Sequence, residues 1–130
     1  MTAEEKECIK STVLPVILGN GAEAHKISAH LFASCEITAL ICGKKSSVRD
    51  FFSTYSRFEQ LSESDSPEIL RNELIGIAKR YSEYLLLLVP SNDEYKDLLE
   101  KLSEELETIF IIRSPNDLFK TSPIADISAD

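Results

Sequence analysis

Apolar residues recur along the chain in two alternating patterns, short continuous runs and longer stretches with helical spacing. The run at residues 84–89 is apolar at every position, which indicates a central parallel strand covered on both faces. A weaker strand is expected around residues 57–61. Runs typical of buried strands occupy residues 13–18, 36–42, 84–89 and 108–112.

Between these runs the spacing becomes helical. Residues 22–34 carry one apolar stripe, and a second helix is expected to begin at Ser66-Pro67, a hydroxyl cap followed by proline. The segment 91–94, Ser-Asn-Asp-Glu, has the pattern of a capping box and predicts a further helix. One more helical turn is expected to begin at residues 114–117.

Strands that alternate with helices imply right-handed crossovers and a mainly parallel sheet. The chain is therefore predicted to be an α/β protein, a Rossmann-like doubly wound sheet of about five strands with helices on both faces. The expected strand order is 3-2-1-4-5. One domain is expected over residues 13–120, preceded by an N-terminal extension at 1–12 and followed by a flexible tail at 121–130.

Composition narrows the class of protein further. With 130 residues, of which 43% are hydrophobic, the chain can bury a core without disulfides or metal. The net charge of −8 argues against a nucleic-acid surface. Cys8, Cys35 and Cys42 are scattered, as expected for reduced thiols. Residues 85–89 form the longest apolar run, too short to span a bilayer, so we expect no membrane contact and a cytoplasmic location.

The segment after the first strand fits the pattern G-x-G-x-x-A. Gly19 would permit a tight turn, Gly21 a close backbone approach by a ligand, and Ala24 close packing of helix on sheet. The second strand, however, ends at Lys44 without the acidic residue that binds a ribose. Glu23 would also repel an anion at the helix start. A structural turn is favoured over a dinucleotide site.

Other residues that carry chemistry have simple structural explanations. His25 and His30 lie five positions apart and so on different helix faces, which disfavours a metal pair. Cys42 is expected to be a small core residue and not a nucleophile. The acidic residues at 100–107 are typical of a solvated helix face. Asp93 lies beyond a strand's carboxyl end, where ligands of open α/β sheets bind, although helix capping accounts for this segment.

Four segments together follow one template in order. They read LPVILGNG at residues 14–21, ALICGK at 39–44, LLLVPSNDEY at 86–95 and IFII at 109–112. In order and spacing the chain resembles the N-terminal pre-ATP-grasp domain of ATP-grasp carboxylate–amine ligases, the group that includes D-aspartate ligase-like enzymes. The resemblance covers about residues 13–119.

The resemblance implies a Rossmann half that packs against ATP-grasp domains and helps wall their site. Such a ligase activates a carboxylate as an acyl phosphate with ATP and magnesium, and an amine then attacks it. By position, Gly19–Gly21 with Asn92, Asp93 and Tyr95 would face the acceptor side of that site. The residues that bind ATP and metal belong to later domains. One departure is that Asn20 and Glu23 stand where a loop better suited to an anion is expected.

We therefore expect a stand-alone pre-ATP-grasp-like domain that is not catalytic alone, either an accessory subunit of a ligase or the first domain of a longer one. The alternative is a small nucleotide-binding or regulatory Rossmann module. No cofactor is expected in the isolated chain. ATP and Mg would be bound only through a partner ATP-grasp domain. Partners would be an ATP-grasp protein or a small carboxylate or amine ligand; a homo-oligomer is left open. Candidate ligand-binding residues are Gly19, Asn20, Gly21, Lys44, Asn92, Asp93 and Tyr95.

Overall fold

A computed structural model describes residues 12–19, 21–44, 56–62 and 66–115 of the chain. The candidate residue Asn20, most of the N-terminal extension and the C-terminal tail lie outside these ranges, as does most of the helical turn expected at 114–117. In the described part, no helix is both long and apolar enough to cross a membrane.

Five strands form one parallel sheet in the order β3-β2-β1-β4-β5, so the predicted strand order is confirmed. β1 is central, and its Ile17 is aligned with Ile41 on one side and with Val89 on the other. The strands are β1 (Val13–Leu18), β2 (Ala39–Gly43), β3 (Ser56–Gln60), β4 (Leu85–Pro90) and β5 (Ile111–Ile112).

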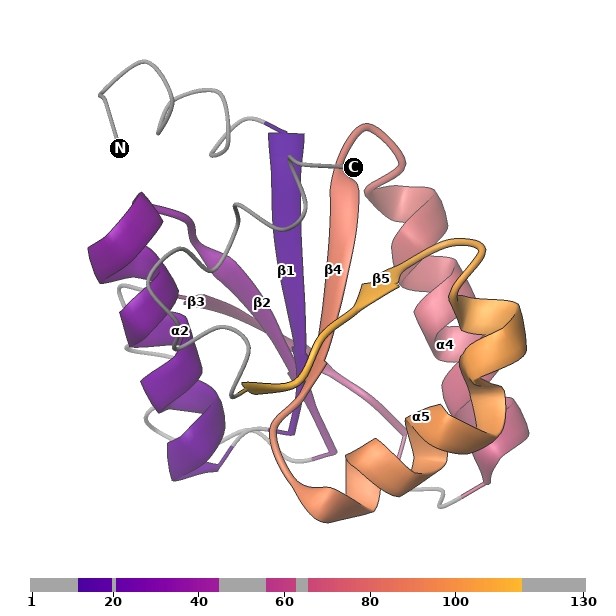
Figure 1. Ribbon diagram of the computed structural model, residues 1–130. Helices are drawn as coiled ribbons and strands as arrows, with labels where there is room; N and C mark the ends of the chain where they lie inside the picture. Colours follow the sequence, from indigo (N-terminus) through magenta and orange to yellow (C-terminus); the bar gives the residue numbers. More distant parts are fainter. Residues whose placement is uncertain (1–11, 20, 45–55, 63–65, 116–130) are drawn as a thin grey trace.

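Helices cover both faces of the sheet, as Figure 1 shows. Helix α2 (Ala22–Cys35) lies on one face, and α4 (Pro67–Arg80) and α5 (Asp93–Leu106) lie on the other. This arrangement is the predicted α/β Rossmann-like fold.

Alternate residues of the central strands supply two separate cores. On the α2 face, Ile17 and Ile41 pack with Ile27. On the opposite face, Leu18 and Leu88 join the buried side of α4 and α5. The central strands β1, β2 and β4 are covered on both faces, and that is why their sequences read as continuous apolar runs.

Two strands are shorter than the sequence predicts. The strand expected at 36–42 begins only at Ala39, because Glu36 closes α2 in a left-handed conformation with φ of 58°. The strand expected at 108–112 is reduced to β5, because the backbone amides of Ile109 and Phe110 both donate to the carbonyl of Leu106. In both places, the first residues of the apolar run terminate the preceding helix and do not belong to the strand.

Candidate functional site

The ends of β1, β2 and β4 are tied together at the carboxyl edge of the sheet. The amide of Gly19 donates a 2.7 Å hydrogen bond to the carbonyl of Cys42 at the end of β2. From the end of β4, the Ser91 amide and hydroxyl both donate to the carbonyl of Leu18, at 2.9 and 2.6 Å. The order of the sheet reverses between β1 and β4, where ligands of open α/β sheets bind. Here the chain itself fills that position.

Gly19 has a structural role at this junction. Its φ of +97° is a conformation that favours glycine, as the predicted tight turn requires. A Cβ placed there would lie 2.3 Å from Ser91 Oγ and 3.1 Å from Asn92 Nδ2. The close approach that this glycine permits is therefore made by the segment after β4.

Gly21 is placed differently, at the start of α2. It is exposed, its φ is −80°, and a Cβ there would meet nothing within 4 Å. Its backbone is open to an approaching group, although ligand binding there stays a prediction. Ala24, one turn further on, is fully buried against the sheet, as the G-x-G-x-x-A pattern predicts.

Helix α5 begins one residue later than the predicted capping box would place it. Asn92 is the cap, and its Oδ1 accepts a 2.9 Å hydrogen bond from the amide of Tyr95. Ser91 does not cap the helix, because its hydroxyl is bonded to Leu18. Asp93 is left exposed in the first turn, where a carboxylate favours the helix dipole.

Lys44 and Tyr95 connect the end of β2 to α5. The Nζ atom of Lys44 lies 3.6 Å from Oε1 of Glu94. Tyr95 is directed into the core and keeps only 6% of its surface exposed. Burial raises the pKa of the Tyr95 hydroxyl, while the nearby charge of Lys44 acts in the opposite direction. Tyr95 therefore offers a ligand little surface.

The structure brings most of the predicted site residues to one edge. Gly19 lies against Asn92 and Tyr95, and Lys44 reaches the same helix start through Glu94. Lys44 and Tyr95 enclose almost no space, since the cavity that they line measures about 10 Å³. That volume would hold at most one water molecule. A ligand of these residues would sit on an open surface.

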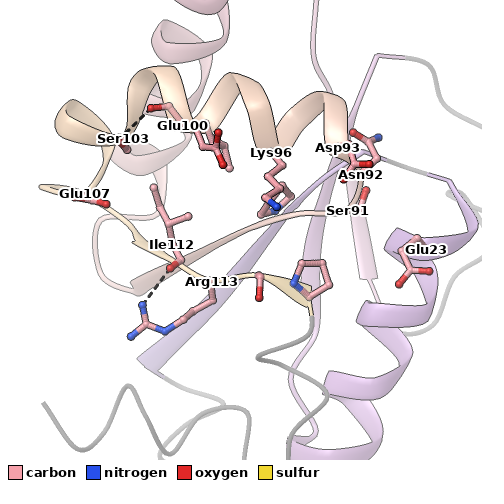
Figure 2. Close-up of a pocket in the computed structure, with 14 residues that line it drawn as sticks. Glu23, Ser91, Asn92, Asp93, Lys96, Glu100, Ser103, Glu107, Ile112 and Arg113 are labelled. Atoms are coloured by element: carbon pink, nitrogen blue, oxygen red, sulfur yellow. Dashed lines mark hydrogen bonds between the residues drawn. The ribbon is translucent and has the colours of Figure 1, made fainter.

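A much larger cleft of about 630 Å³ opens beside this edge. Figure 2 shows it between α5 and the end of β5, with Glu23 contributed by the start of α2. Asn92 and Asp93 belong to both the predicted site and the cleft. The sequence analysis did not predict as site residues the rest of its wall: Pro90, Ser91, Lys96, Leu99, Glu100, Ser103, Glu107, Ile112, Arg113, Ser114 and Pro115.

The cleft combines an apolar base with charges of both signs. Leu99 and Ile112 line it, and its four carboxylates belong to Glu23, Asp93, Glu100 and Glu107. Its two cationic side chains are Lys96 and Arg113. Arg113 Nη1 donates to the carbonyl of Ile112 at 3.1 Å (Figure 2). The wall of the cleft is therefore acidic on balance.

Cys42 is not an activated thiol, and the described residues form no metal-binding group. Cys42 is fully buried, and this burial raises the pKa of its thiol to about 12. The thiol stays protonated, in line with the predicted core role. Within the described ranges, no three His, Cys, Asp or Glu side chains are grouped so that they could hold a metal ion.

Comparison with known proteins returns no match to this chain, whether among family models, curated proteins or solved structures.

Proposed function

We propose that this chain is a pre-ATP-grasp-like domain without catalysis of its own, which walls one side of a site completed by an ATP-grasp partner. It would act as an accessory subunit of an ATP-dependent carboxylate–amine ligase or as the first domain of one. The proposal is carried by one observation. The predicted site residues gather at the carboxyl edge of the sheet, where Gly21, Asn92 and Asp93 are exposed and the cavity lined by Lys44 and Tyr95 measures only about 10 Å³.

The arrangement of this edge supports a shared site. Gly21, Asn92 and Asp93 are exposed there, and Lys44 is partly exposed. Binding pockets usually bury most of a small ligand's surface, and an open edge cannot do so alone. We therefore expect affinities on the order of millimolar for amino acids or small carboxylates, a gain of only about 4 kcal/mol. A partner that covers the edge would supply the missing walls.

The partner would also supply the phosphoryl chemistry. Acyl-phosphate formation relies on positioned cations and magnesium around the transferred phosphoryl group. In the proposed assembly, the residues that bind ATP and magnesium belong to the ATP-grasp domains. This chain contributes exposed backbone at Gly21 and polar side chains at Asn92 and Asp93 toward the acceptor.

The alternative, a nucleotide-binding or regulatory Rossmann module, is less well supported by the geometry. Ser91 and Asn92 occupy the space beside Gly19 where a phosphate would approach the loop. Glu23 and Asp93 place carboxylates in the first turns of α2 and α5, where they oppose a second anion. Both features make nucleotide phosphates poor ligands for this edge.

Calorimetric titration tests the proposal. Amino acids and ATP are titrated into the chain alone and into its mixture with a purified ATP-grasp ligase offered as the partner. We expect weak binding to the chain alone and at least roughly tenfold tighter binding in the mixture, about 1.4 kcal/mol. Micromolar nucleotide binding by the isolated chain would instead support the regulatory module.

The variant Gly21→Val tests where the ligand approaches. A branched side chain at Gly21 would block the exposed backbone, while the space around it is open, so the fold should tolerate it. We expect the gain in affinity to be lost and the melting temperature to change little. If the variant unfolds, the loop is structural and this part of the site is refuted.

A further inference from the structure

The cleft beside the proposed site is larger than a free amino acid needs. Its 630 Å³ corresponds to roughly twenty water molecules at about 30 Å³ each. Leu99 and Ile112 give it an apolar base. A free amino acid would leave much of this surface in contact with water. The volume is large enough for several consecutive side chains of a polypeptide.

The cleft also runs along the end of the sheet. Ile112 belongs to β5, the last strand in the order β3-β2-β1-β4-β5, and it lines the cleft together with Arg113. An edge strand can accept an extended segment of another chain beside it. A polypeptide in the cleft would therefore lie next to backbone as well as to side chains.

The acidic side chains of the cleft indicate that such a polypeptide would be basic. Glu100 projects from α5 at the cleft, and Glu107 lines the cleft just after the last residue of that helix (Figure 2). On another side of the helix, Glu105 is paired with Arg71 within the chain. Among the described residues, no ion pair neutralises any of the four carboxylates of the cleft: Glu23, Asp93, Glu100 and Glu107.

We propose that the cleft is a docking groove for an extended basic segment of the partner protein. An aliphatic side chain of that segment packs on the partly buried Ile112, and flanking Lys or Arg side chains pair with Glu100 and Glu107. The inference rests on the proposed function in that it requires a partner. It adds where the partner is held and by which chemistry.

A designed peptide probes the groove directly. The probe is a fluorescein-labelled octapeptide in which Lys or Arg alternates with Leu. Its binding to the full chain is measured by fluorescence anisotropy. Two matched peptides replace either the basic residues by Glu or the Leu residues by Ser. We expect the basic, Leu-containing peptide to bind best and to weaken as salt is added, because salt screens charge pairs. Equal binding of the acidic peptide, or of the Ser-containing one, would overturn the proposal.

Charge reversal locates the binding. Glu100→Lys changes the groove, and Glu83→Lys makes the same change at an exposed position just before β4 and away from the cleft. We expect Glu100→Lys to weaken the peptide about fivefold to tenfold and Glu83→Lys by less than about twofold. Equal losses of peptide affinity in the two variants would refute the groove. Complete displacement of the peptide by an equal concentration of free lysine would also refute it.

The outcomes separate this proposal from the proposed function. If Glu100→Lys leaves peptide binding unchanged while the ATP-grasp protein still tightens ligand binding, the groove is wrong and the shared site stands. If the peptide binds in a Glu100-dependent way but the ATP-grasp protein has no effect, the groove stands and the assignment to a ligase is wrong.

Discussion

The hydroxyl of Ser91 donates a buried hydrogen bond of 2.6 Å to the carbonyl oxygen of Leu18, 73 residues earlier in the chain. The Ser91 amide reaches the same oxygen at 2.9 Å. These bonds join the ends of β4 and β1 where the sheet order reverses. They explain why the predicted glycine loop faces protein at Gly19, whereas Gly21 is exposed.

Removing this hydroxyl should destabilise the fold modestly. Ser91→Ala leaves the Leu18 carbonyl bonded to the amide alone, and we expect a loss of about 1 kcal/mol in the free energy of unfolding. Urea denaturation measures it. The matched control is Ser103→Ala, whose hydroxyl donates to the Glu100 carbonyl on an exposed part of α5 and should matter less. Equal losses in the free energy of unfolding would show that the bond from Ser91 to Leu18 stabilises the fold no more than the exposed bond does.

Substitution by serine should destabilise the protein at one glycine of the loop and have little effect at the other. Gly19→Ser imposes an unfavourable φ and a clash with Ser91, so we expect a loss of roughly 1–3 kcal/mol. Gly21→Ser supplies a hydroxyl at the start of α2, where no side chain caps the helix, and should change stability by less than about 0.5 kcal/mol. Denaturation curves of both variants decide this, and a stable Gly19→Ser protein would contradict it.

Cys42 should resist alkylation as long as the protein is folded. Its thiol is buried and its pKa is raised to about 12, so little thiolate forms at mildly alkaline pH. The measurement uses a Cys8→Ser, Cys35→Ser variant, in which iodoacetamide can label only Cys42. Labelling should be slow in buffer and fast in guanidinium chloride. Rapid labelling of the folded variant would mean that the thiol is accessible.

The raised pKa of the Cys42 thiol predicts that the protein loses stability at high pH. Above its ordinary pKa of 9.0, the unfolded chain releases a proton that the folded chain keeps until about pH 12. The free energy of unfolding should therefore fall as pH rises through this window. The raised pKa of Tyr95 acts in the same direction. In Cys42→Ala the decline with pH should be shallower, and an unchanged slope would show that the thiol does not contribute.

The sequence predicted the sheet because each central strand is apolar on both faces. The all-apolar run now assigned to β4 lies inside the sheet, and proline at the first position of α4 marks that helix start correctly. The strand limits were less predictable. Glu36 adopts a left-handed conformation that is uncommon for a residue other than glycine, and no local pattern signals it.

The candidate site was predictable only in part, because its details depend on tertiary contacts. Ser91 and Asn92 both suit a helix cap, and the choice between them depends on the distant Leu18 carbonyl. The cleft was missed because the acidic side of α5 reads as an ordinary solvated face. Arg113 follows β5 at the carboxyl edge, a position that the strand-end rule could have flagged.

Hydrogen–deuterium exchange with the same ATP-grasp ligase that is used in the titration tests the central claim most directly. It reports which amides of this chain become protected when the partner binds. The account predicts protection at the start of α2, in residues 91–96 and in residues 112–115, with little change in α4. Protection confined to α4 or to the amino ends of the strands would contradict it, as would unchanged exchange across the chain.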